Sequence, residues 1–194
     1  MSVALSEHVG PWTIADVEAL PDNGDHSRYE ILTPGVLTVS PAPGFLHQRA
    51  SRRLANLLDA GAVAAGVDVE ILESINVEIP GGRLTIPDIV VVDAAYSETD
   101  PTRCQPDKVH AVVEIVSPST HPQDRIIKPR LYADAKILVY WRLELERVPH
   151  LVVSRLRRGQ YVHVATATAG EPTEIADPFP IKVDPATLVR RPGR

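Results

Sequence analysis

The apolar positions of the chain follow two different periods. Between residues 47 and 60 apolar side chains recur at helical spacing and arginines lie mostly on the opposite side, which predicts an amphipathic helix that Gly61 ends. A shorter helix is expected within residues 12–24. A third helical segment, residues 124–136, contains Pro129, so this helix is either interrupted there or begins there.

Other segments have the alternating or continuously apolar patterns of β-strands. A hairpin is expected over residues 29–39, where two short strand-like runs flank Thr-Pro-Gly. Residues 68–80 alternate, which predicts a strand with one wet face, whereas residues 83–93 and 110–118 are apolar and β-branched and are predicted to be central strands. Further strand candidates are residues 137–144, 150–166 and 178–183.

The order of these segments favours an α/β domain, a mixed β-sheet flanked by helices on both faces. A length of 194 residues with 44% hydrophobic content fits one domain with a substantial core. Within it we expect a peripheral N-terminal lead-in over residues 1–27, a core over residues 28–161, and C-terminal strands and a tail over residues 162–194.

Composition narrows the classes of function. The net charge of -5 argues against a surface that is basic throughout, so any nucleic-acid site must be local. The single cysteine, Cys104, excludes an internal disulfide and a cysteine-based zinc site. The first residues lack the pattern of a secretion signal, and no apolar run is long enough to span a membrane, so we expect a cytoplasmic protein without a membrane partner.

Two carboxylates interrupt the predicted central strands. Glu114 lies in an apolar run, where alternation places it on the face opposite Ile115, and Asp88 directly follows Pro87, which cannot donate a hydrogen bond to a neighbouring strand. Burying either carboxylate unpaired costs several kcal/mol, so each needs a cation, a hydrogen-bond network or solvent. A shared divalent metal ion would satisfy both.

This arrangement resembles the PD-(D/E)XK nuclease superfamily, in which Pro-Asp on one strand is followed by an acid, any residue and lysine on the next. Pro87-Asp88 and Glu114-Ile115-Val116 occupy those places. More of the chain is similar to the Uma family (Uma-two) of restriction endonucleases, through RYEILTPGVLTVSPAPGFLHQ, IPDIVVVD, VVEIVSPST and VYW, over residues 28–161. The resemblance implies a restriction-endonuclease-like fold.

The resemblance also implies a catalytic site. Asp88 and Glu114, with the carbonyl of Ile115, would hold Mg²⁺ or Mn²⁺, the hard cations that prefer oxygen ligands. Val116 stands where the superfamily usually has its lysine, and the Uma pattern moves that role to Lys128 on the following helix. Lys128 would lower the pKa of the attacking water or neutralise the developing charge.

Three further residues are candidates for supporting roles, and each has an ordinary alternative. Glu30 would bind the metal through water or hold Lys128, or else form a salt bridge within the hairpin. His47 would approach the phosphate or cap the long helix, and the structural role is favoured. Asp124 would orient Lys128 or simply begin its helix. Tyr132 is interpreted as a core or interface residue and not as a base-stacking group.

The predicted function is therefore metal-dependent hydrolysis of DNA phosphodiester bonds by an endonuclease. A homodimer is expected, because cutting two strands suits two sites related by a twofold axis. Val116, Pro129 and the acidic net charge leave a second hypothesis open, a catalytically inactive nuclease fold that binds DNA or protein. A third hypothesis is a dimeric scaffold with a vestigial site.

Overall fold

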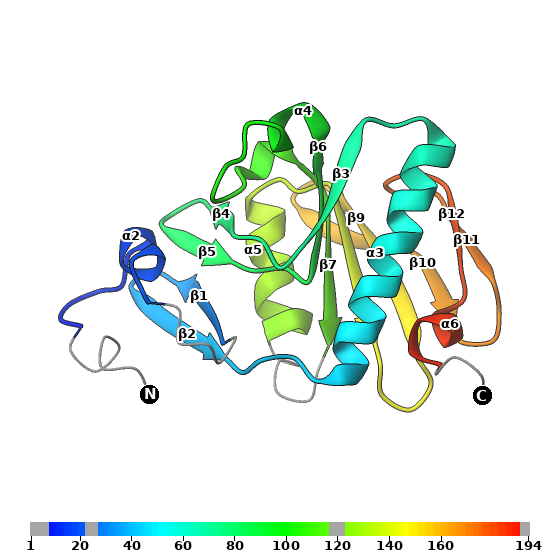
Figure 1. Cartoon of the computed structure of the whole chain (residues 1–194), viewed down its shortest axis with the longest axis horizontal. Helices are drawn as coiled ribbons and strands as arrows, with labels where there is room; N and C mark the ends of the chain where they lie inside the picture. Colours follow the sequence, from blue (N-terminus) through cyan, green and yellow to red (C-terminus); the bar gives the residue numbers. More distant parts are fainter. Residues whose placement is uncertain (1–7, 22–26, 117–122, 191–194) are drawn as a thin grey trace.

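A four-stranded β-sheet lies beside a six-stranded one, and a long helix packs across the larger sheet (Figure 1). The structure, a computed structural model, describes residues 8–21, 27–116 and 123–190. The larger sheet has six strands, in the order β10 (Gln160–Thr168), β9 (His150–Arg157), β8 (Val139–Glu144), β7 (Val109–Val116), β6 (Ile89–Asp93) and β3 (Val69–Glu73). Its strands β7 and β8 are parallel and its other pairs are antiparallel, so the sheet is mixed.

The second sheet has four antiparallel strands and contains the predicted hairpin. Its order is β2 (Val36–Ser40), β1 (Arg28–Thr33), β5 (Arg83–Thr85) and β4 (Val77–Ile79). A small third sheet pairs β11 (Thr173–Ile175) with β12 (Ile181–Val183). The helices are α2 (Ile14–Glu18), α3 (Phe45–Ala65), α4 (Ala94–Ser97), α5 (Lys128–Asp134) and α6 (Pro185–Val189), with a 3-10 turn at Pro106–Lys108 and a π-helical turn at Gln123–Ile127.

Apolar side chains on both faces of the six-stranded sheet form two hydrophobic cores. On one face Ala50, Leu54 and Leu58 of α3 belong to the same core as Val113 and Ile115 of β7. On the other face the core joins strands of both sheets to α5, through Leu32 and Ile79 of the small sheet, Val92 and Val112 of the large one, and Tyr132 of α5. The expected mixed sheet flanked by helices is thus confirmed, and β7 alternates between the two cores as predicted.

Helix α3 is longer than its sequence pattern predicts. Gly61 does not end the helix but lies inside it, and the helix ends instead at Gly66, whose φ of 63° is left-handed. The reason is tertiary packing, because a Cβ atom at Gly61 would lie 2.3 Å from Ile181 Cγ2 and 3.2 Å from Phe179 Cε2. Glycine at this position lets α3 pack closely against the segment that leads into β12.

Two segments that were each predicted as one strand are divided between the two sheets. Residues 68–80 form β3 and β4, and residues 83–93 form β5 and β6. The first division occurs near Ser74, which has a φ of 56°, and the second occurs at Pro87. Since proline cannot donate a ladder hydrogen bond, the chain leaves the small sheet before Pro87 and joins the large sheet after Asp88.

Pro129 lies in the first turn of α5, the position where a helix tolerates proline because the amide N–H would be unpaired there in any case. The π-helical turn Gln123–Ile127 precedes it and Lys128 is the first residue of the α-helix. The helical segment therefore changes type beside the proline, from a π-helical turn to the α-helix that starts at Lys128.

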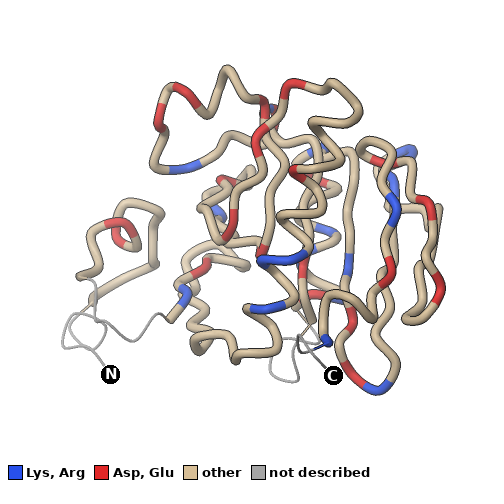
Figure 2. The backbone as a smooth tube through the Cα atoms, turned by 45° about the vertical axis from the view of Figure 1, so that its right-hand side comes forward, with Lys and Arg blue, Asp and Glu red and all other residues tan. Residues whose placement is uncertain are grey.

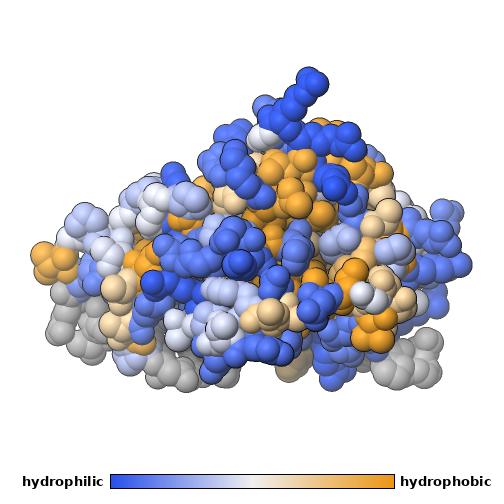
Figure 3. Space-filling view, turned by 90° about the horizontal axis from the view of Figure 1, so that it is seen from above, coloured by the Kyte–Doolittle hydropathy of each residue, from blue (hydrophilic) through white to orange (hydrophobic). Residues whose placement is uncertain are grey.

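The charged residues are interleaved over the whole backbone (Figure 2). Seen from above, hydrophilic residues cover most of the surface, and apolar residues gather near the middle of that face (Figure 3). Within the described ranges, no helix is long and apolar enough to cross a bilayer.

We predict that Gly61→Ala lowers the free energy of unfolding by about 1–3 kcal/mol. The new methyl group would overlap Ile181, and this clash outweighs the gain of about 0.5–1 kcal/mol that alanine brings to a helix interior. Urea unfolding followed by circular dichroism measures the change. Ala64→Gly, at an exposed position of the same helix, measures the difference in helix propensity between alanine and glycine without a change in packing. Equal or greater stability of Gly61→Ala would contradict the packing account.

Candidate active site

The segment that connects β5 in the small sheet to β6 in the large sheet brings Asp88 beside the end of β7. Strand β6 runs antiparallel to β7 with Ile89 opposite Val113, so the residue before β6 lies next to Glu114 and Ile115. The amide N–H of Ile115 donates to Asp88 Oδ2 at 2.6 Å. The two carboxylates that the sequence singles out therefore lie at the same edge of the sheet.

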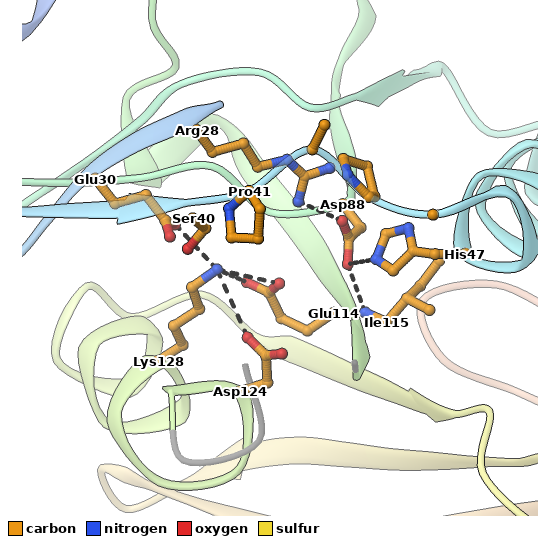
Figure 4. A pocket seen from close by; sticks show the side chains of 13 residues that line it. Arg28, Glu30, Ser40, Pro41, His47, Asp88, Glu114, Ile115, Asp124 and Lys128 are labelled. Carbon is orange, nitrogen blue, oxygen red and sulfur yellow. Dashed lines mark hydrogen bonds and ion pairs between the residues drawn. The ribbon is translucent and has the colours of Figure 1, made fainter. Parts of the chain in front are cut away.

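A cavity of about 240 Å³ opens at this edge. It lies between the ends of β6 and β7, the N-terminal end of α3, the beginning of α5, and the loop that leads from β2 to α3 (Figure 4). All seven residues predicted for the site line it, together with Arg28 and the loop residues. The lining residues are Arg28, Glu30, Ser40, Pro41, Ala42, Pro43, Gly44, His47, Asp88, Glu114, Ile115, Asp124 and Lys128.

Lys128 lies at the centre of a group of carboxylates. Its ammonium nitrogen is 2.9 Å from Glu30 Oε1, 3.1 Å from Glu114 Oε1 and 3.7 Å from Asp124 Oδ1, and all four side chains are buried. Burial lowers the pKa of Lys128, but the three carboxylates, Glu114 most strongly, raise it overall. The ammonium group is therefore charged at neutral pH.

Asp88 is held by proton donors from three directions. Arg28 Nη1 lies 2.5 Å from Oδ1, while His47 Nε2 lies 3.2 Å from Oδ2, the oxygen that also accepts the Ile115 N–H. Burial raises the pKa of Asp88, but these contacts, led by that of His47, outweigh burial and lower the pKa to about 2. Asp88 is therefore an anion at any pH of interest.

Glu114 has the opposite electrostatic character. It is almost completely buried, and its oxygens contact Lys128 and the Tyr132 hydroxyl, which donates at 2.5 Å. Burial raises its pKa well above the ordinary value of a glutamate, the ammonium of Lys128 opposes this rise, and the nearby carboxylates add to it. As it stands, the pocket favours the protonated form of Glu114.

The buried charges of the pocket do not balance. Among the described residues that line it, four carboxylates, those of Glu30, Asp88, Glu114 and Asp124, face two permanent cations, Arg28 and Lys128. His47 adds a positive charge only when it is protonated. A low-dielectric site with excess carboxylates either takes up protons, as the raised pKa of Glu114 indicates, or takes up a cation.

The donor set fits a hard divalent ion. Carboxylate oxygens and a main-chain carbonyl are the ligands that Mg²⁺ and Mn²⁺ prefer, and the two excess negative charges equal the charge of such an ion. Within residues 8–21, 27–116 and 123–190, no three side chains of His, Cys, Asp or Glu are arranged so that they could hold a metal together. The predicted set does not require three, because its third ligand is the carbonyl of Ile115.

The supporting residues have specific contacts. Glu30 contacts Lys128 and also accepts the N–H of Ile86, which corresponds to the alternative in which it holds the lysine. His47, in the first turn of α3, contacts Asp88. Asp124 lies near Lys128, and its carbonyl accepts the Tyr140 hydroxyl at 2.5 Å.

Sequence analysis did not assign Arg28 or Tyr132 to the site. Arg28 and Glu30 are two residues apart on β1, so strand alternation places them on the same side, and this spacing was the available signal for Arg28. Tyr132 is fully buried, as its interpretation as a core residue requires, but its hydroxyl also reaches Glu114. It lies one helical turn after Lys128, so its position on the same face was the signal there.

The comparison with protein families identifies the family of the chain. Residues 14–188 match the family model Uma2, described as "Putative restriction endonuclease". The chain belongs to the Uma2 family. The matched span contains every residue that lines the cavity described above.

A solved structure shows that the fold is shared. The chain is similar to a protein from Anabaena variabilis ATCC 29413 whose crystal structure is described as that of "a putative nuclease belonging to DUF820". The TM-score is 0.66 at 15% sequence identity, over 92% of this chain and 98% of the other. This likeness supports the nuclease-like fold of the Uma2 chain. The comparison with curated proteins found no match.

Removing the central ammonium group should strongly destabilise the fold. We predict that Lys128→Met lowers the free energy of unfolding by about 3–5 kcal/mol, because three carboxylates lose their shared cation in a buried site. The loss should shrink as the pH falls from 8 to 5, since the carboxylates then protonate. Urea unfolding at several pH values measures it. The control is Lys108→Met, because the Lys108 side chain is 44% exposed and its Nζ lies 3.9 Å from Asp107 Oδ2, so this variant should change stability little. An equal loss of stability in both variants would refute the account.

The raised pKa of Glu114 makes a second prediction, for metal-free protein. A carboxyl group with a raised pKa in the folded state makes the protein lose stability as pH rises above about 4.3, the ordinary pKa of glutamate. Glu114→Gln removes this titration, so its stability relative to the wild type should increase with pH between 4.5 and 8. Urea unfolding in the presence of EDTA tests this, with exposed Glu171→Gln as the control. A difference that does not change with pH would contradict the assignment.

Proposed function

We propose that the protein is a metal-dependent endonuclease that hydrolyses DNA phosphodiester bonds at the cavity between β6, β7 and α5. The observation that carries the proposal is the excess of buried carboxylates around this cavity, which makes it a site for a divalent cation. Membership of the Uma2 family supports the choice of reaction, and the likeness to a crystal structure described as a nuclease supports the fold that such a reaction needs.

Asp88, Glu114 and the carbonyl of Ile115 are the proposed metal ligands. Asp88 is ionised and is oriented by the Ile115 N–H, so this ligand need not lose a proton before it binds a cation. Glu114 would give up its proton when a cation binds. A bound Mg²⁺ or Mn²⁺ supplies Lewis-acid chemistry, polarising a phosphoryl oxygen and lowering the pKa of the attacking water.

Lys128 is proposed to act as a fixed cation. Because its pKa is raised by the surrounding carboxylates, it cannot serve as a base that accepts a proton. It can stabilise the negative charge that develops on the phosphoryl group, and Glu30 and Asp124 hold it in position. Val116 cannot supply this charge from β7, so α5 supplies it from a different element.

A catalytically inactive DNA- or protein-binding module is the second candidate function. The observation in its favour is that the proposed ligands are already engaged, Asp88 by Arg28 and Glu114 by Lys128. Salt-sensitive DNA binding without cleavage in any divalent ion would support this candidate. In either case we propose that the protein works as a homodimer, which would present one site to each DNA strand.

The endonuclease proposal predicts cleavage of plasmid DNA that requires Mg²⁺ or Mn²⁺ and stops in EDTA. Asp88→Asn and Glu114→Gln should each lower the rate by at least about 100-fold, because the metal contributes several kcal/mol of transition-state stabilisation. Asp88→Ala and Glu114→Ala should do the same. Agarose gels that separate supercoiled, nicked and linear forms measure the rates.

The control is Asp107→Asn, which changes an exposed carboxylate outside the cavity and should leave cleavage unchanged. Circular dichroism confirms that each variant is folded. Cleavage by Asp88→Asn and Glu114→Gln at the wild-type rate would end the proposal.

A further inference from the structure

Arg28 occupies a position that the proposed metal needs. It is the first residue of β1, its Nη1 lies 2.5 Å from Asp88 Oδ1, and its Nη2 donates to Ser74 Oγ at 2.9 Å. The other carboxylate oxygen, Oδ2, accepts the Ile115 N–H and faces His47. Oδ2 thus has two donors and Oδ1 has Arg28, so a metal ion that binds Asp88 through Oδ1 would lie directly beside the Arg28 guanidinium.

Arg28 is the donor best able to move. The Ile115 N–H is part of the backbone of β7, and His47 is fixed in the first turn of α3 with 10% of its side chain exposed. The Arg28 side chain is 18% exposed and is joined to the backbone by a longer, more flexible stem. Its second acceptor, Ser74, belongs to the turn after β3 and not to the proposed ligand set, so this contact does not depend on Asp88.

We propose that Arg28 is an exchangeable counter-ion, which neutralises Asp88 when no metal is bound and moves to a phosphate group of the DNA when a divalent ion binds Asp88. This inference rests on the proposed function, because it names the residue that the metal displaces. It assigns to the site a phosphate-binding guanidinium in addition to the fixed ammonium group of Lys128.

Electrostatics makes the exchange favourable. Burial disfavours the charge on Arg28, but Asp88 and the other carboxylates of the cavity outweigh this and raise its pKa, so the group remains a cation. A divalent ion on Asp88 would remove the partner of this cation and repel it at close range. Arg28 also lines the cavity, so a phosphate that enters it would come within reach of the guanidinium.

The guanidinium group of Arg28 is also suited to bind a phosphate group. A guanidinium group presents paired N–H donors that match the oxygens of a phosphate, whereas an ammonium group acts as a point charge. Lys128 is surrounded by three carboxylates and has no such freedom. The site would thus contain one fixed cation and one that changes its partner.

The test compares wild type and Arg28→Ala in two binding measurements. Calorimetric titration with Mn²⁺, without DNA, should show a dissociation constant at least about fivefold lower for the variant, because a competitor has been removed. Fluorescence anisotropy with a short DNA duplex in saturating Ca²⁺ should show about tenfold weaker binding by the variant, because a charged phosphate contact has been lost. Gels confirm that the duplex stays intact.

Tighter Mn²⁺ binding together with weaker DNA binding distinguishes exchange from a purely structural role. If Arg28 were only structural, its loss would weaken the binding of both Mn²⁺ and DNA. Arg28→Lys keeps the charge and should show smaller changes of the same sign. Arg103→Ala is the matched control, since Arg103 contacts Glu18 and Glu78 outside the cavity, and it should change neither constant. Circular dichroism verifies that each variant is folded.

The outcomes separate this inference from the proposed function. If wild type binds Mn²⁺ and Arg28→Ala binds it equally or more weakly, the exchange is wrong and the metal site stands. Unchanged DNA binding by Arg28→Ala would also overturn the exchange. If neither protein binds Mn²⁺, both the exchange and the metal-dependent function are wrong.

Discussion

The site depends on one constraint: four carboxylates are buried around a cavity that contains two permanent cations. A fold tolerates such an arrangement only if further positive charge, protons or a metal ion compensates for it. In the metal-free protein the compensation is a shared ammonium group at Lys128, a guanidinium at Asp88 and a carboxyl group at Glu114 that favours its protonated form. The same features are the basis of the proposal that the cavity binds a hard divalent cation.

The passage of the chain from the small sheet to the large one brings these carboxylates together. Pro87 ends the pairing of β5 in the small sheet and lets the chain enter β6 in the large one, which places Asp88 at the edge where β7 ends. The small sheet contributes Arg28 and Glu30 from β1, and α5 contributes Lys128 from its first turn. Most of the charged groups thus lie in or directly beside elements that the hydrophobic cores hold in place, while the loop from β2 to α3 closes one side of the cavity.

The sequence predicts most of the fold and the acidic half of the site, because both depend on local patterns. Strand alternation places Glu114 opposite Ile115, and Pro129 indicates a change in the helical segment next to Lys128. What it does not predict depends on contacts between distant segments. The Arg28–Asp88 pair joins residues that are 60 positions apart in different sheets, and Gly61 continues its helix because of side chains that follow more than a hundred residues later.

The most direct test of the account is the anomalous scattering of Mn²⁺ in a crystal of the protein soaked with this ion. The account predicts one strong peak in the cavity, bonded to oxygens of Asp88 and Glu114 and to the carbonyl of Ile115, with the Arg28 guanidinium no longer in contact with Asp88. A cavity without a peak, in a crystal where Arg28 still holds Asp88 at saturating Mn²⁺, would contradict it.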